Sequence, residues 1–312
     1  MKWQKYFFIS ALVCCLQFSA WGGDGQEQGG GYKRFDSSIR RFLMGGMDTA
    51  FVKLPSTSWE IPVVTKIYGY QSRMTIDDAI IPMNTPAMVE VGAGVGYHGL
   101  DLVYTHTVGR NRMDFNFEFD FYDNYWGVGI NIGRQGFGKE IYGESGAQSA
   151  DEVVCRAILL DGYYAVFGNR FSYPASIYGN YIQKKSAGSP LVNFWYERRD
   201  YWAQTSRAAA MLDKLRKSHF DNFAITAGYG YNFSIAEGRA VLTVSAGAGI
   251  LLPSFGLSTE ARAGGMIWAN DHLRISFAIS NFYSKSWNRK DNCLEDNTWR
   301  GSVGVFYCFG KG

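Results

Sequence analysis

A short run of lysine, serine and glycine residues has the side chains best suited to bind a ligand. It reads Gln183-Lys184-Lys185-Ser186-Ala187-Gly188-Ser189. The two lysines could bind an anionic group, and the serines could donate hydrogen bonds to it. Serine and glycine are also ordinary turn formers, so the run is equally typical of a tight turn or bulge. Its glycine spacing is not that of a phosphate loop. The candidate residues of this motif are Gln183, Lys184, Lys185, Ser186, Gly188 and Ser189.

Charged and amide side chains form a second candidate set, because they alternate with apolar ones. In residues 113–121, phenylalanines alternate with acids and amides without a break. Successive strand side chains point to opposite faces, so the polar residues share one face. In a barrel that face lines the lumen, as a selective pore wall or as a packed, salt-bridged interior. The candidate lumen-facing residues are Glu90, Asp101, Asp114, Asn116, Glu118, Asp120, Arg156, Glu260, Arg262 and Arg274.

Histidines and cysteines are too scattered to indicate a catalytic or metal centre. The spacing of the four histidines predicts no catalytic group of histidine, serine and acid, and no paired metal-ligand spacing occurs. We therefore expect no catalytic residue, no metal and no cofactor. Cys155 and Cys293 fall near the same side of the expected topology, where they either form a disulfide or remain free thiols.

The N-terminal segment has the features of an export signal. Two lysines precede an apolar run over residues 6–18, and small residues follow at 19–23. The run is shorter than the ~20 residues that a membrane-spanning helix needs. We expect a signal peptide over residues 1–22. Residues 23–58 should then form a glycine-rich linker with a short periplasmic helix over 36–44, and residues 59–310 the main domain.

The main domain is expected to be an all-β, antiparallel transmembrane β-barrel of about twelve strands. Aromatic residues make up 16% of the chain, and it has 37 glycines but only 7 prolines, which favours aromatic-rich strands. Within lipid, only helices and closed barrels satisfy every backbone polar group. The expected strands are 59–75, 87–98, 100–108, 112–122, 125–133, 155–167, one within 174–197, 220–234, 239–252, 256–268, 272–285 and 299–310.

An even strand number places both ends of the barrel chain on the periplasmic side. The long gaps 134–153, 198–219 and 286–298 then all fall on the outer side, as in outer-membrane barrels. The aromatic last strand ends near Phe309, where we expect the barrel-assembly machinery to bind. The other expected partner is outer-membrane lipid. A net charge of +3 gives no reason to expect nucleic acid, and the ligand is unknown.

Several fragments resemble one protein family. They are Phe167-Gly168-Asn169-Arg170-Phe171-Ser172-Tyr173-Pro174-Ala175, the Gln183–Ser189 run, Met47–Phe51 and Gly96–Leu100. Together they are similar to the domain of unknown function 4421, a family of exported Bacteroidetes proteins regarded as outer-membrane barrels. Pro174 stands where the family pattern has a basic residue. The resemblance implies the fold and the outer-membrane location, and it supplies no catalytic residues because the family has no assigned activity.

Three functions are compatible with these features. The first is an outer-membrane channel, or a binding or structural barrel without catalysis. The second is a surface-interaction protein that works through the long outer loops. The third is an outer-membrane enzyme that acts on lipid or a surface polymer.

Overall fold

The computed structural model describes residues 29–76, 79–108, 115–137, 140–141, 153–203, 219–252, 255–288 and 292–311. The expected signal peptide, residues 1–22, lies outside these ranges. The chain divides into two compact units, and the boundary between them follows Leu43. None of the helices in the described ranges is long and apolar enough to cross a membrane.

The first unit contains one described helix, α2 (Gly29–Leu43). It begins earlier than the helix expected over 36–44. Asp36 and Ser37, at the start of the expected range, lie inside it, and the Ser37 hydroxyl donates a hydrogen bond to the Arg34 carbonyl at 2.9 Å.

The second unit consists mainly of long antiparallel strands. They are β2 (Thr57–Ile76), β3 (Ala79–Tyr97), β4 (Leu100–Thr107), β5 (Phe115–Tyr122), β6 (Trp126–Phe137), β8 (Val153–Ala165), β10 (Ala187–Ala203), β11 (His219–Ile235), β12 (Ala240–Leu252), β13 (Phe255–Asn270), β14 (Leu273–Asn288) and β15 (Asn292–Lys311). The remaining elements are short: β1 (Val52–Lys53), β7 (Glu140–Ile141), β9 (Ile182–Gln183), α3 (Pro174–Ile177) and the 3-10 turn η1 (Ala236–Gly238).

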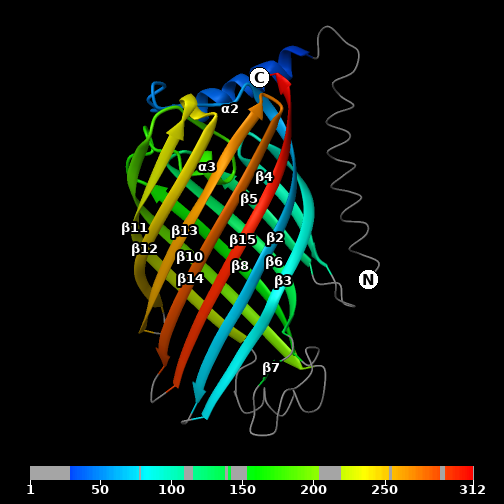
Figure 1. Ribbon diagram of the computed structural model, residues 1–312, viewed down its shortest axis with the longest axis vertical. Coiled ribbons are helices and arrows are strands. Elements are labelled where there is room, and N and C mark those ends of the chain that lie inside the picture. The colour runs from blue at the N-terminus through cyan, green and yellow to red at the C-terminus, as the bar shows by residue number, and fades with distance from the viewer. Residues whose placement is uncertain are drawn as a thin grey trace. The chain divides into compact units, whose positions relative to one another are not determined.

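These twelve long strands close into a barrel. Each pairs with its sequence neighbour among the long strands, and β2 pairs with both β3 and β15. Figure 1 shows red β15 beside blue β2 where the ring closes. The predicted fold class and strand number are thus confirmed, including the single strand within 174–197. Closure leaves no unpaired edge, which is the condition for β-structure in lipid.

The two ends of the barrel differ. We call the end where β2 begins and β15 ends the near end, and the opposite end the far end. The near end has tight links at 98–99, 236–239 and 271–272, and His98 and Glu237 there adopt positive φ angles of 48° and 56°. Short links also occur at the far end, where two residues separate β2 from β3 and β12 from β13, and three separate β14 from β15. The far end also carries the long links 138–152 and 204–218, and the near end carries the long link 166–186.

One expected loop is largely strand. Residues 286–298 were expected to form a long gap, but β14 and β15 stay paired as far as Asn288 and Asn292. Lysine, asparagine and acidic residues give this stretch a loop-like composition, although its backbone continues the hairpin. β10 and β11 likewise extend into the gap at 198–219. The central parts of the other two gaps lie outside the described residues.

The outward face carries an apolar band, because alternate residues of each strand point away from the lumen. On β15, Val303, Val305 and Tyr307 are exposed while Gly304 and Phe306 are buried. On β12, Leu242, Val244 and Ile250 are exposed in the same way. This alternation is typical of a barrel that faces lipid.

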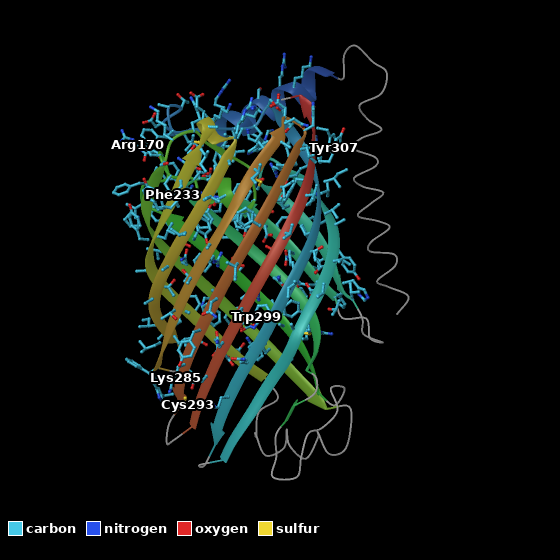
Figure 2. The ribbon with its side chains drawn as sticks, viewed as in Figure 1. Arg170, Phe233, Lys285, Cys293, Trp299 and Tyr307 are labelled. Atoms are coloured by element: carbon cyan, nitrogen blue, oxygen red, sulfur yellow. The ribbon has the colours of Figure 1, made fainter. Side chains whose placement is uncertain are left out.

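We expect the cost of a charge on this face to depend on its depth in the bilayer. Val303 lies nearer the middle of β15, whereas Tyr307 lies at the near end (Figure 2). Val303→Arg should lower the free energy of unfolding by about 2–4 kcal/mol and Tyr307→Arg by about 0–1 kcal/mol. Urea unfolding of the protein refolded in phospholipid vesicles measures both. Equal costs at the two positions would contradict a lipid-facing band.

Candidate functional site

The segment that links β8 to β10, residues 166–186, folds into the near end of the lumen, and we call it the plug. It contains α3, which contacts β12, β13 and β14. Figure 1 shows α3 within the ring of strands close to the near end. β9 of the plug pairs antiparallel with β1, so residues 52–53 hold the base of the segment.

An apolar cluster joins the plug to the barrel wall. Phe171 and Tyr173 are buried with the wall residues Tyr122, Tyr163 and Leu191. The rings of Tyr163 and Tyr173 lie 4.6 Å apart. Because these wall residues come from β5, β8 and β10, the plug is packed against a broad arc of the lumen.

A buried arginine fixes the opposite side of the plug. Arg274 of β14, whose side chain is 1% exposed, donates hydrogen bonds to the carbonyls of Gly179 (2.6 Å) and Tyr178 (2.8 Å). It also forms an ion pair with Glu60 of β2. A buried guanidinium is tolerated only when paired and hydrogen-bonded, so these groups depend on one another. Gly179 has φ +71° and faces Arg274 so closely that a side chain would clash there.

Gln183 is the centre of a hydrogen-bond network at the base of the plug. Its side-chain oxygen accepts from the Ser172 backbone N–H (2.8 Å) and from Asn232 Nδ2 (3.1 Å). Its amide nitrogen donates to the carbonyls of Arg170 (2.7 Å) and Lys185 (2.8 Å). The side chain is fully buried and saturated with partners, so it serves to hold the chain in place.

The other motif residues also bind protein groups. Lys184 Nζ donates to the Thr49 carbonyl at 3.1 Å, and Lys185 lies over the Phe51 ring at 5.5 Å. Ser186 Oγ accepts from the Ser234 backbone N–H at 3.0 Å. Ser189 Oγ accepts from the Phe167 N–H at 2.9 Å. The placement of the motif matches the structural interpretation, a chain turn, and not a lysine pair that faces the lumen.

Gly188 completes this motif on the wall. It is the second residue of β10 and pairs with Tyr231, and a Cβ atom at Gly188 would lie 2.4 Å from the Tyr229 hydroxyl. The glycine therefore gives the tyrosines of β11 room to lie against β10.

A buried acid meets the plug between β5 and β6. Asp123 accepts a hydrogen bond from the Tyr181 hydroxyl at 2.8 Å. Burial raises the pKa of the Asp123 carboxyl above its ordinary value, and donors from Asn124, Tyr181 and Tyr125 partly oppose that effect. The Tyr181 ring, 1% exposed, thus links the plug to a loop of the wall.

Beyond the plug, the inward side chains are more exposed to solvent, and we call this part of the lumen the chamber. Side chains that point inward near the plug are almost fully buried, as Arg274 and Tyr181 illustrate. Further along the lumen, the Lys66 side chain is 23% exposed and the Arg262 side chain is 33% exposed. Arg300 is also exposed, although it points into the barrel. Figure 2 shows Trp299, the residue before Arg300, in the middle part of the barrel. Exposure of inward side chains at this level indicates solvent-accessible space.

The chamber wall is polar and carries both signs of charge. Lys66 forms an ion pair with Glu118, which also accepts hydrogen bonds from Asn116 (2.9 Å) and Asn131 (3.0 Å). Glu260 accepts from Asn193 and, at 3.0 Å, from Thr226. The ion pair between Lys66 and Glu118 offsets two of the charges on the chamber wall.

A second layer of contacts crosses the lumen on the far side of the chamber. The Arg199 guanidinium of β10 lies over the Tyr70 ring of β2 at 4.4 Å and donates to its hydroxyl. Arg199 also pairs with Glu197 (2.6 Å) and Asp296 (3.6 Å). β2 and β10 lie opposite one another in the strand order, so these contacts span the lumen. We call this set the far-end bridge.

Apolar side chains add to the far-end bridge. Trp195 of β10 and Phe282 of β14 meet edge to face with ring centroids 4.5 Å apart. The surrounding inward residues are again nearly fully buried, for example Ser72 (2%) and Asp296 (3%). Inward side chains are therefore buried near the plug, more exposed in the chamber and buried again at the far-end bridge.

Most of the predicted lumen-facing residues point inward. Glu90, Asp101, Asn116 and Asp120 are buried within the barrel, and Glu118, Glu260 and Arg262 line the chamber, while Arg274 binds the plug. Glu90 accepts hydrogen bonds from Tyr68 (3.0 Å) and Thr105 (2.8 Å). Asp114 lies outside the described residues.

Arg156 corrects the expected set. It is exposed and in phase with Ile158 and Leu160 on the outward face of β8, opposite Arg134 of β6. The error has a physical cause. β8 carries aliphatic residues on both faces, so alternation alone could not assign its inward side.

Of the two alternatives for Cys155 and Cys293, the structure matches free thiols and not a disulfide. Cys293 is a free thiol, and Cys155 and Cys293 belong to β8 and β15, which lie opposite one another in the ring. Sequence position relative to one end of the barrel could not reveal on which side of the ring each cysteine stands.

The described histidines do not assemble with one another. His106 is on the outward face of β4, and His98 lies in a near-end turn. The His272 ring nitrogen Nδ1 lies 2.9 Å from the Cys308 carbonyl oxygen. Within the described residues, no group of three or more His, Cys, Asp or Glu side chains is arranged to hold a metal ion.

Several inward charges were not among the predicted residues. They are Glu60, Lys66, Asp161, Glu197, Arg199, Asp296 and Arg300. Period-two phase with neighbouring apolar residues could have identified Glu60, Lys66 and Arg300. Asp161 lies in the two-faced apolar strand β8, and Glu197 and Arg199 fall in a charged stretch, so their phase was hidden.

A family model described as "Domain of unknown function (DUF4421)" matches residues 47–284. No curated protein matches the chain. Among solved structures, the translocator domain of the autotransporter NalP from Neisseria meningitidis has a TM-score of 0.37 and 10% identity, with 91% of this chain and 98% of that chain covered. The beta domain of the Bordetella autotransporter BrkA gives 0.37 and 14%, with 81% and 100% covered. An outer membrane channel from Pseudomonas putida F1 gives 0.34 and 9%, with 84% and 99% covered.

We expect Gln183→Met to loosen the plug selectively. The substitution removes the partner of the buried Ser172 N–H, which should cost about 1–3 kcal/mol. Hydrogen exchange should then become faster in the amides of residues 170–186 and remain slow in β12–β14. Lys184→Met is the matched control, because it removes one hydrogen bond from the neighbouring position. Uniform acceleration throughout the barrel would show that Gln183 does not act locally.

Proposed function

The chain belongs to the DUF4421 family, and on that premise we propose that it is an outer-membrane barrel that works as a gated channel, closed by its plug. The observation that supports the proposal best is the chamber behind the plug. A barrel with a purely structural role has no need of accessible space, since small barrels fill their interiors with side chains. Here a separate chain segment seals a lumen that is lined with polar groups.

The way the plug is held also supports gating. Its two ends continue into β8 and β10 at the near end, so it can leave the lumen without breaking the barrel. Its contacts with Arg274, Asp123 and Asn232 are hydrogen bonds, which water or a partner can replace. The far-end bridge consists of side chains, and side-chain rotation moves them on a short timescale.

The proposal includes a location. Residues 1–22 would direct export and be removed, the barrel-assembly machinery would insert the chain, and the apolar band would contact outer-membrane lipid. The far end, which carries the long links 138–152 and 204–218, would then face outward, the usual side for long loops, and the near end with the plug would face the periplasm.

Conductance in planar bilayers tests the channel. We expect the full-length protein to be mostly closed. A variant with residues 171–181 replaced by a glycine-serine linker, combined with Arg199→Ala, should show stable ionic conductance. Each change alone should give less. A permanently open full-length protein would contradict closure, and a combined variant that stays silent would contradict a continuous lumen.

A cysteine experiment separates gating from a static plug. In a background in which the native mature cysteines are replaced, Ser176→Cys places a thiol in α3, where the serine is fully buried. A water-soluble thiol reagent should modify it slowly in liposomes and faster in the Gln183→Met background. Thr243→Cys, buried in the wall, should stay protected, and Ser186→Cys, which is exposed, should react at once. Complete protection of Ser176→Cys in both backgrounds would mean that the plug does not move.

A further inference from the structure

Two opposite charges face the chamber from opposite sides of the barrel. Arg300 projects from β15 and Asp161 from β8, and six strand steps separate these strands in either direction round the ring. Asp161 lies within electrostatic range of the cations Arg262 of β13 and Arg300, and of the acids Glu118 and Glu260, which already have partners of their own. Asp161, Arg262 and Arg300 therefore act on the same region of the lumen.

These groups lack the close partners that other chamber charges have. Glu118 has Lys66 and two asparagines, and Glu260 has Asn193 and Thr226. In the part of the chain that the structure describes, the side chains of Arg300 and Asp161 form no hydrogen bond to another side chain and no ion pair within 4 Å, although both residues are paired through the backbone of their strands. Arg262 makes only long contacts, 4.0 Å to Glu260 and 5.9 Å to the Tyr173 ring of the plug.

We infer that the chamber binds a small zwitterionic solute, with its acidic group at Arg300 and Arg262 and its amine at Asp161. The inference deepens the proposed channel function, because this solute would be what the lumen admits. Guanidinium groups suit carboxylates and phosphates, and a carboxylate suits an ammonium group. A ligand with both charges satisfies both sides of the chamber. An anion alone would leave Asp161 unpaired beside it, and a cation alone would leave Arg300 unpaired.

The contact between Arg262 and Tyr173 places this site directly behind the plug. Tyr173 is buried in the cluster that holds the plug to β8 and β10. A solute whose acidic group draws Arg262 toward the chamber would therefore act on a side chain that touches the gate. Arg262 would therefore link binding of the solute in the chamber to release of the plug.

The test compares a zwitterion with its separate halves. Glycine and 4-aminobutanoate, two zwitterions of different length, are titrated by calorimetry into the full-length protein and the plug-replaced variant in detergent. Acetate and methylammonium are the single-charge probes. We expect at least one zwitterion to bind, and each single-charge probe to bind at least about tenfold more weakly, since it satisfies only one side. The plug-replaced variant removes the possibility that a closed chamber excludes the probe.

Variants locate the site. Arg300→Gln and Asp161→Asn should each weaken binding by about tenfold or more. Arg198→Gln is the matched control. Arg198 precedes Arg199 on β10 and points outward, so this variant should bind normally. If a single variant fails to fold, the exchange Arg300→Asp with Asp161→Arg keeps the net charge and should retain binding with the solute reversed.

Three outcomes would overturn the inference. They are no zwitterion binding to either protein, equal binding of acetate, or normal binding by Arg300→Gln. The first two outcomes do not affect the conductance results. A protein that conducts ions without binding a zwitterion would therefore refute the proposed ligand and leave the proposed channel function standing. A silent combined variant that still binds the zwitterion would refute the channel and keep the site.

Discussion

Closure of the backbone hydrogen-bond ring is the constraint on which the rest of the structure depends. β2 must pair with β3 on one side and with β15, the last strand of the chain, on the other. Without that final pairing, two strand edges would expose unpaired N–H and C=O groups, which lipid cannot satisfy. Closure also creates an interior. Every second residue of each strand then points its side chain into this enclosed space, whether that side chain is polar or apolar.

The chain manages that interior in three ways along the lumen. Near the plug, wall side chains are buried by a segment of the same chain. At the far-end bridge, side chains from opposite strands meet directly. In the chamber between them, acids and bases are only partly paired. The charges that lie close together, such as Lys66 with Glu118, offset each other's desolvation, and the uncompensated ones occur where space remains for solvent.

The sequence was most informative where one face of a strand is apolar and the other is polar. Phe115 to Phe121 and Leu242 to Leu252 reveal their strands and faces at once, because period two is the geometry of the strand itself. The method failed on β8, where aliphatic residues occupy both faces and Arg156 was given the wrong side. It also failed at residues 286–288 and 292–298, since a polar composition predicts a loop although the strands of the hairpin continue beyond the apolar band.

The plug could not have been predicted in the same way. Its motif residues have turn-forming side chains, and those describe local conformation only. Gln183 receives its role from Ser172 and Asn232, and Arg274 from the carbonyls of residues 178 and 179, all of them distant in sequence. The alternation of apolar and polar residues, and the amino-acid composition, give no information about partners that are distant in sequence.

The partners of the plug also constrain how the protein can assemble. The plug is made of residues 166–186, yet it binds Asn232 of β11 and Arg274 of β14, which are synthesised later. Its docking site is complete only after β14 has joined the wall. The plug can therefore reach its bound position only once β11 and β14 are in place, so a change that displaces either strand also releases the plug.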